Sequence, residues 1–166
     1  ANWAISTANA GTPGDHVAGA AATADGITLR PVYAYTPPAA FFDGGDIAAG
    51  TPNVFNVLDF GAIADPAFNN QPAIQAAIQA AHDAGGGIVV IPDGVYGIGG
   101  HPSGNGGIQM LDDVFLKGGG MGETVLRVLD GFNQTMTGIV RSPYDEATDN
   151  WGIAALSLDG NRAGNA

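Results

Sequence analysis

The sequence predicts an all-β solenoid, a fold in which the chain winds parallel strands into successive coils. Two observations support this prediction. After about residue 84 the chain consists of short, β-branched apolar runs that end at glycines or polar turns, with no helical pattern between them. Several runs are apolar at consecutive positions, as is typical of strands buried in parallel sheets. Parallel strands without crossover helices exclude a doubly wound α/β fold and favour a solenoid.

The first part of the chain, residues 1–52, differs in composition from the rest and predicts an extended arm or linker. It is rich in Ala, Gly and Thr and follows neither a helical nor a strand period over most of its length. Residues 27–35 alternate well enough for one strand, which Pro31 confines to an edge. The two phenylalanines at 41–42 are expected to anchor the arm on the solenoid, which we assign to residues 53–166.

A single amphipathic helix is predicted at about residues 70–84. Asn69 or Asn70 can cap its N-terminus, and Pro72 suits its first turn. Apolar residues recur at i, i+3, i+4 and i+7 from Ile74, which gives one apolar stripe, and a run of glycines ends the helix. The first coil of a solenoid exposes an apolar end and open backbone edges. We therefore expect this helix to cap the N-terminal end of the solenoid.

The strands that follow the helix fill only a few coils. They are predicted within residues 87–98, 107–120, 123–131, 137–144 and 152–161. A solenoid needs a cap at both ends, and the sequence shows only the first. We therefore expect the rear of the last coil to be open or covered by something outside this sequence, such as further coils of the same protein or a neighbouring subunit.

Composition excludes several classes of function. The net charge is −11, which makes binding to nucleic-acid phosphates unfavourable, and the absence of Cys excludes disulfides and thiolate metal sites. No apolar run is long enough to cross a membrane. An acidic surface suits solubility and, outside the cell, calcium. The basic residues are Arg30, Lys117, Arg127, Arg141 and Arg162. Any basic groove must therefore lie in the C-terminal third.

Two stretches resemble a known family. "NVLDFGAIAD…AIQAAIQAAHDAGGGIVVIPDGVYGI" resembles the N-terminal cap and first coil of the pectate-lyase-like superfamily of right-handed parallel β-helices. "MLDDVFLKGGGMGETVLRVLDGFNQTMTGIVRSPYDEATDNWGIAALSLDGNR" is similar to the start of the catalytic module of secreted, calcium-dependent mannuronan C5-epimerases. The resemblance runs from about residue 56 to residue 162 and does not include residues 1–52. In place of the usual acidic pair and Thr before the helix, this chain has "PAFNNQPA".

The resemblance implies an extracellular, modular enzyme that converts mannuronate to guluronate within alginate, with calcium as the implied metal. The C5 proton beside a carboxylate is very weakly acidic, so the reaction needs a base, an acid and a group that neutralises the developing charge. In the family, an Asp-Pro-His-Glu motif with a nearby Tyr and Lys supplies these groups. That motif is absent here. We therefore expect the catalytic residues to lie beyond Ala166 and this chain alone to be inactive.

Five residues are candidates for contact with the polysaccharide. Arg141 can bind a uronate carboxylate through two hydrogen bonds, although an ion pair with one of the acidic residues at 145–146 is the structural alternative. Tyr144 is expected either to stack on a sugar ring or to pack. Asp159, Asn161 and Arg162 form a turn that would lie near the cleft added by further coils.

Other residues are assigned structural roles. Lys117 is expected to be solvated at the end of its strand, and His82 to sit at the helix C-terminus, where the dipole favours a cation. No metal-ligating residues are predicted, because the histidines lack partners nearby in sequence. The acidic pairs at 112–113 and 145–146 make no catalytic dyad, since neighbouring strand residues face opposite ways.

Two alternatives to the epimerase remain open from the sequence. One is a non-catalytic segment of a phage tailspike or surface fibre, which would place the protein on a virion or cell surface. The other is a polysaccharide lyase on the same scaffold, because β-elimination shares the intermediate of epimerisation. The residues after "LDGNRAGNA" would distinguish these possibilities from the epimerase.

Overall fold

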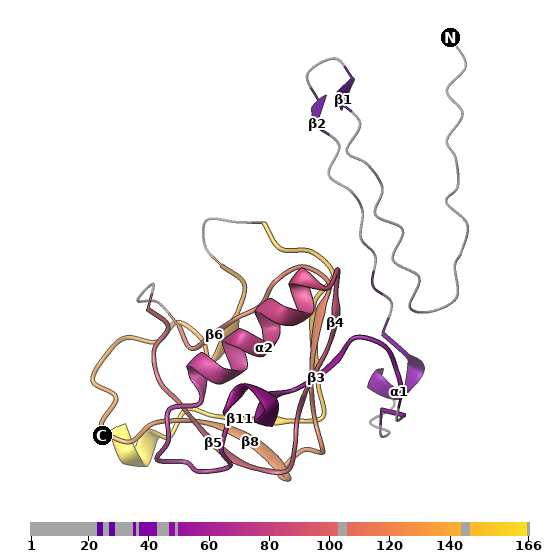
Figure 1. Ribbon diagram of the computed structural model, residues 1–166. Helices are drawn as coiled ribbons and strands as arrows, with labels where there is room; N and C mark the ends of the chain where they lie inside the picture. The colour runs from indigo at the N-terminus through magenta and orange to yellow at the C-terminus, as the bar shows by residue number, and fades with distance from the viewer. Residues whose placement is uncertain are drawn as a thin grey trace.

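The computed structural model of the chain describes residues 23–24, 27–28, 35, 37–42, 47–48, 50–102, 106–143 and 147–165. Most of these residues form a coiled body of parallel strands (Figure 1). The body has three parallel sheets among the described residues. The first sheet contains β3 (Val54–Asn56), β4 (Gly87–Ile91), β7 (Val114–Gly118) and β10 (Gly152–Ala154), and the second contains β5 (Gly94–Ile98), β8 (Thr124–Val128) and β11 (Ser157–Asp159). The third sheet contains β6 (Ile108–Gln109) and β9 (Val140–Arg141).

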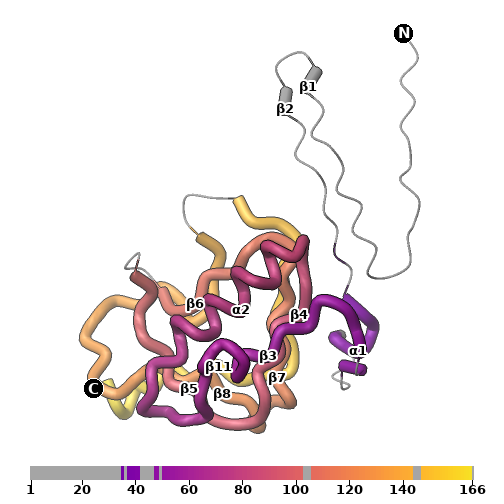
Figure 2. Tube along the Cα trace, in the orientation of Figure 1, coloured from indigo at the N-terminus to yellow at the C-terminus, as the bar shows by residue number. Residues whose placement is uncertain are grey.

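The chain visits the three sheets in turn and then repeats the circuit. It passes through β4, β5 and β6, and the next strands β7, β8 and β9 each pair in parallel with the strand one coil earlier. β10 and β11 continue the stacking on β7 and β8. The tube in Figure 2 follows these successive turns. The arrangement is a parallel β-helix, as the sequence predicts, and its right-handedness remains a prediction.

A continuous apolar core fills the space enclosed by the coils. Alternate strand residues point inward, so that Ile88 and Val90 of β4 face outward while Val89 and Ile91 face the core. The buried members of this core are Val57, Ala62, Ile74, Ala77, Ile78, Ala81, Val89, Ile91, Tyr96, Ile98, Ile108, Met110, Val114, Leu116 and Leu126. Burial of so many side chains in one cluster is the main source of stability.

The predicted helix is α2 (Gln71–Asp83), and it lies across the body in Figure 1. Its stripe of Ile74, Ala77, Ile78 and Ala81 is fully buried. The helix packs against β3, β4, β6, β7 and the 3-10 helix η1 (Val57–Phe60). Helix α2 therefore contributes its apolar face to the same core that the strands fill.

The N-terminus of α2 is satisfied in a different way from a simple side-chain cap. Asn70 is the N-cap residue, but its side chain makes no capping bond to the helix. Instead its Oδ1 accepts from the Ile63 N–H at 2.7 Å. Asn69 supplies the local acceptor, since its Oδ1 receives the N–H groups of Gln71 at 3.2 Å and Gly99 at 2.9 Å. The two asparagines thus join the helix start to the preceding loop and to β5.

Tyr35 and α1 (Ala39–Phe42), in the N-terminal part of the chain, pack on the outside of the β3–β4–β7–β10 sheet. β1 (Thr23–Ala24) pairs antiparallel with β2 (Ile27–Thr28), and α1 follows. Tyr35 and Phe41 are buried against Ile88 and Phe115 in a second apolar cluster, with the Phe41 and Phe115 rings edge to face at 5.3 Å. Phe41 therefore anchors this segment on the body, as expected from its composition.

The expectation that Lys117 is solvated is wrong. Its side chain is only 4% exposed, on the outer face of β7 between Val90 and Ala154 in the register of the sheet. The sequence around Lys117 predicts the end of a strand, but it does not predict that the side chain is buried there.

No helix in the described part of the chain is both long and apolar enough to cross a membrane.

Candidate functional site

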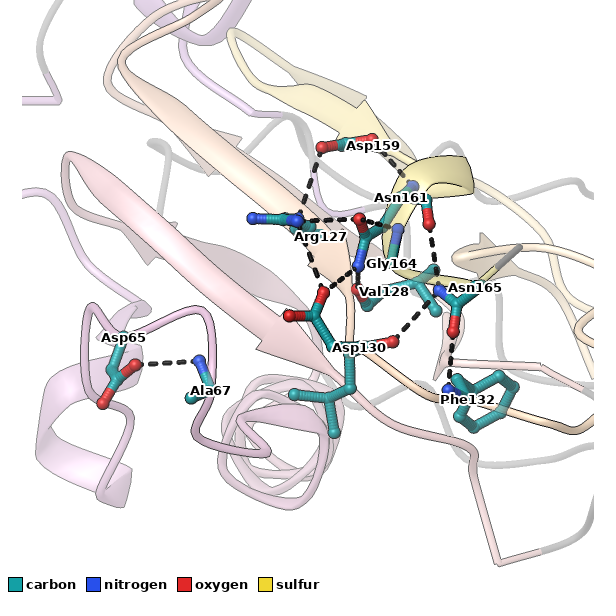
Figure 3. Close-up of polar contacts among 11 residues, drawn as sticks. Asp65, Ala67, Arg127, Val128, Asp130, Phe132, Asp159, Asn161, Gly164 and Asn165 are labelled. Carbon is teal, nitrogen blue, oxygen red and sulfur yellow. Dashed lines mark hydrogen bonds and ion pairs between the residues drawn. The ribbon is translucent and has the colours of Figure 1, made fainter.

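The turn after β11 is organised by the side chain of Asn161 (Figure 3). Asn161 is 4% exposed and has a left-handed backbone, with φ at 48°. Its Nδ2 donates to the Val128 carbonyl at 2.9 Å and to Asp130 Oδ1 at 2.6 Å. Its own N–H donates to Asp159 Oδ1 at 2.8 Å, which closes an Asx-type turn. Asn161 therefore ties its coil to the coil before.

Arg127 of β8 completes this network. Its guanidinium donates to Asn161 Oδ1 at 2.7 Å and to Asp130 Oδ1 at 3.3 Å, and its Nε lies 3.7 Å from Asp159 Oδ2. The two carboxylates are largely exposed, so each ion pair adds little to stability on its own. The carboxylates of Asp130 and Asp159 neutralise the charge of Arg127, so this guanidinium is unsuited to bind a uronate.

The last element is η2 (Arg162–Asn165), and its first and last residues have different environments. Asn165 Nδ2 donates to the Leu129 carbonyl at 3.1 Å, and its Oδ1 accepts from the Phe132 N–H at 2.6 Å. Arg162 is exposed and makes no hydrogen bond or ion pair with the described residues. Of the three candidates in this turn, Asp159 and Asn161 hold the fold, while Arg162 presents a charge to solvent.

Arg141 lies at the end of β9, in a different sheet from β11. Ile108 and Val140 contribute to the core, so their neighbours Gln109 and Arg141 face outward and stand side by side in the register of β6 and β9. Arg141 is half-buried and donates to the Ser142 carbonyl at 3.1 Å. The structure therefore does not bring Arg141 together with the Asp159–Arg162 turn by any contact among the described residues.

Tyr144 lies outside the described residues, as do the acidic residues at 145–146 that could pair with Arg141. The expected roles of these side chains stay predictions.

The described residues were also tested for a calcium site. No three His, Asp or Glu side chains among them lie close enough to hold a metal ion. Asp130 and Asp159 both lie beside Arg127, which already pairs with their carboxylates. The described part of the chain therefore does not fit a side-chain calcium site, and no step of the chemistry is assigned to a metal here.

An open hollow of about 350 Å³ lies beside the Asn161 turn. It lies between the loop after β8 and η2, and Asn165 contributes to its wall. Its lining residues are Val128, Phe132, Gln134, Met136, Gly138, Ile139, Gly160 and Asn165. Of the candidate residues that the structure describes, Arg141, Asp159, Asn161 and Arg162, none lines it.

Sequence reasoning missed several residues that organise these turns. Arg127, Asp130 and Asn165 bond across coils, over separations of more than thirty residues for the Asn161 and Asn165 contacts. The sequence alone gives little indication of these bonds, because only the register between successive coils shows which side chains lie close together. The Asp-Gly-Asn turn itself could have been read as an Asx turn, since Asp followed by Gly-Asn suits that geometry.

The fold and the site define a class: a parallel β-helix whose polar turns lie along the stacked coils, as in proteins that act on polysaccharides. The family model described as "Rhamnogalacturonase A/epimerase, pectate lyase-like" matches residues 54–164. The chain belongs to this family.

Two curated relatives and one solved structure, all from Azotobacter vinelandii, show the same likeness. Mannuronan C5-epimerase AlgE1 is 52% identical over 113 residues, which are 67% of this chain and 8% of that protein. Alginate lyase 7 is 46% identical over 109 residues, 65% of this chain and 13% of that protein. The A-module of mannuronan C-5 epimerase AlgE6 is 50% identical with a TM-score of 0.63, over 68% of this chain and 30% of the module. The chain thus spans a small part of each.

Proposed function

We propose that this chain is the N-terminal part of a mannuronan C5-epimerase module, which converts mannuronate to guluronate within alginate. The observation that carries the proposal is the identity of about half of the residues with such modules over two thirds of the chain, in the same fold. The chain spans only 30% of the solved module, so the acid, base and neutralising group of the reaction are assigned to residues outside it.

The role proposed for this chain's own residues is to bind and orient the polymer. A uronate carboxylate is planar and anionic, and an arginine guanidinium matches it with two parallel hydrogen bonds. Arg141 is assigned to the end of β9, and Arg162 to the η2 turn, where it is exposed. Tyr144 lies outside the described residues and stays a candidate from the sequence alone. Asp159 and Asn161 shape that turn through Arg127, so their effect on substrate is indirect.

Helix α2 is proposed to cap the N-terminal end of a right-handed β-helix. Two contacts support this role. Gln75 Nε2 donates to the Gln109 carbonyl at 2.8 Å, and the Gln109 N–H donates to Gln75 Oε1 at 2.9 Å, so one side chain pairs with the edge of β6 as another strand would. His82 Nδ1 lies 3.2 Å from the Asp112 carbonyl. An extracellular setting and calcium dependence are proposed from the family resemblance of the sequence alone.

The proposal is tested with a longer protein that contains this chain followed by the further coils that the proposal assigns to the module. Incubated with mannuronan, it should generate guluronate signals in the proton NMR spectrum of the polymer. The 166-residue chain alone should generate none. Absence of guluronate from the longer protein would refute the epimerase, and conversion by this chain alone would refute the placement of the catalytic groups.

A lyase is the second candidate, because alginate lyase 7 shares 46% of its residues with this chain over the same region. Elimination and epimerisation both begin with removal of the C5 proton, and they differ in whether the leaving group departs before reprotonation. The same incubation distinguishes them, since a lyase shortens the polymer and forms unsaturated ends that absorb in the ultraviolet.

A further inference from the structure

We propose that the hollow beside the Asn161 turn is a binding subsite for one uronate ring, with the Phe132 side chain as its apolar surface and Arg162 as the cation that meets the carboxylate. The inference rests on the proposed function, because it names where this chain would hold one residue of an acidic polysaccharide. Three features support it: the mixed lining of the hollow, the fixed position of Phe132 and the charge of the turn that borders the hollow.

The first feature is the lining of the hollow. Its volume of about 350 Å³ lies at the small end of the range of about 300–1,000 Å³ that is usual for ligand pockets, which suits a single sugar ring. Half of the lining residues are apolar, namely Val128, Phe132, Met136 and Ile139, and the other half are amides and glycines. A pyranose ring has the same division, since its C–H faces are apolar and its hydroxyls donate and accept hydrogen bonds. The lining therefore matches a sugar.

The second feature is the fixed position of Phe132. Its backbone N–H donates to Asn165 Oδ1 at 2.6 Å, as Figure 3 shows. The Gly131 N–H also donates to the Gly164 carbonyl at 3.0 Å, so the loop after β8 is bonded twice to η2. The ring itself approaches the backbone at Gly100, where an added Cβ atom would lie 3.2 Å from Phe132 Cζ. A ring held in this way loses little entropy when a sugar packs on it.

The third feature is the charge of the turn that borders the hollow. Arg162 is the first residue of η2 and lies in the chain between two residues that line the hollow. It is exposed, and it pairs with none of the described residues. The nearby carboxylates of Asp130 and Asp159 pair with Arg127 instead. Arg162 is therefore the cation of this turn that remains for a uronate carboxylate, which a guanidinium binds through two hydrogen bonds.

The two kinds of contact select the ligand in different ways. Burial of a C–H face against Phe132 is available to any hexose ring, whether charged or neutral. The contact with Arg162 is available only to a sugar that carries a carboxylate. The subsite therefore holds the sugar ring through Phe132 and selects uronates over neutral sugars through Arg162. These two contributions can be measured separately with acidic and neutral oligosaccharides.

The test is an NMR titration of the chain with a hexamer of mannuronate and with a neutral hexamer of mannose. Phe132→Ala removes the ring but keeps the N–H that bonds to Asn165, and it should weaken binding of both hexamers about tenfold. Arg162→Gln should weaken binding of the mannuronate hexamer about tenfold and change that of the mannose hexamer less than about twofold. Phe68→Ala is the matched control, because its side chain is 41% exposed and does not line the hollow, and it should bind both hexamers as the parent does.

A variant that fills the hollow tests the place of binding without removing any group. Gly160 lines the hollow, and a Cβ atom added there would meet no atom within 4 Å, so a larger side chain has room. Gly160→Leu leaves the net charge unchanged and should weaken binding of both hexamers about tenfold. Melting temperatures show whether each variant is folded. If the leucine variant is not, Gln134→Ala replaces it, because this exposed lining residue can be truncated without loss of core packing and its removal should weaken binding about threefold.

The proposal is overturned if folded Phe132→Ala binds the hexamers as the parent does, or if Arg162→Gln weakens binding of the acidic and the neutral hexamer equally. It is also overturned if Phe132→Ala weakens binding in this chain but not in a longer protein with further coils, because those coils would then fill the hollow. Binding is measured without turnover, so these failures are distinct from failure of the proposed function. If the longer protein lacks epimerase activity while the binding effects hold, the subsite stands and the epimerase does not.

Discussion

At the scale of single residues, buried polar side chains rather than exposed charges connect the coils. Asn161 illustrates this, because its amide bonds to a carbonyl, a carboxylate and a guanidinium while its own backbone adopts a left-handed conformation. Asn tolerates this conformation better than most residues, since its short side chain can bond locally. The same residue therefore satisfies a turn and a cross-coil network, and no other side chain can do both.

Substitution of Asn161 separates these two contributions. Asn161→Gly keeps the left-handed turn and loses the amide, while Asn161→Ala loses the amide and adds backbone strain of about 1 kcal/mol. We expect the glycine variant to lower the free energy of unfolding by about 2 kcal/mol and the alanine variant by about 3 kcal/mol. Urea denaturation measures both. Exposed Arg162→Ala is the control and should change stability by less than about 0.5 kcal/mol. Equal stability of the Gly and Ala variants would show that the turn is not strained.

Asp113 is a second buried polar residue, and it titrates. Its Oδ1 accepts from the Tyr35 N–H at 3.3 Å and closely from Asn150 Nδ2. Burial raises the pKa of the Asp113 carboxyl, and the charge of Asp112 adds to this, while the hydrogen bonds from Asn150 and Tyr35 and the proximity of His82 oppose it. The fold therefore favours the protonated carboxyl more than the unfolded chain does.

The sign of the resulting pH dependence follows from this shift. A carboxyl with a raised pKa in the fold stabilises most below its ordinary pKa, and the contribution is lost as the pH rises through the raised value. Asp113→Asn keeps one oxygen as acceptor and removes the titration. The melting temperature of the parent relative to this variant should therefore fall as the pH rises across that window. A constant difference between the two proteins would contradict the shifted pKa.

At the scale of elements, helix α2 shows how far the sequence alone reaches. Its position and its buried face follow from the 3.6-residue period and the glycines after it, because both signals are local. The strands could also be located, since their apolar runs end at glycines. The hydrogen bond from Arg127 to Asn161 and the burial of Lys117 could not be predicted. Both depend on which residues of different coils meet. The candidate site was therefore predicted in residue type but not in partners.

The contact between α2 and β6 can be tested at a single side chain. Gln75→Ala removes both hydrogen bonds that this side chain makes to the half-buried backbone of Gln109. We expect a loss of about 1–3 kcal/mol in the free energy of unfolding. Gln79→Ala is the matched control on the exposed face of the same helix, where the side chain bonds only to Asp83, and it should lie within about 0.5 kcal/mol of the parent. Similar losses in both variants would show that Gln75 does not close the edge of β6.

At the scale of the whole molecule, the outer face of the β3–β4–β7–β10 sheet raises the question of where the folded body begins. The sequence assigns residues 1–52 to an arm, yet Tyr35 and Phe41 bury the outward-facing Ile88 and Phe115. Asn150 Nδ2 also donates to the Tyr35 carbonyl at 2.9 Å, from a coil more than a hundred residues later. Contacts of this kind belong to a folded unit rather than to a linker. We therefore expect the segment that contains these two residues to unfold together with the β-helix.

Two truncations test this expectation. A chain that starts at residue 35 keeps Tyr35 and Phe41, and its melting temperature should match that of the parent. A chain that starts at residue 51 exposes Ile88 and Phe115, and it should lose roughly 3 kcal/mol or more of stability, as expected when large aromatic side chains leave an apolar cluster. Phe41→Ala in the full chain should reproduce most of that loss, because it removes the ring that packs edge to face on Phe115. If both truncations melt with the parent, residues 35–50 lie on the body without stabilising it, and the boundary near residue 52 holds.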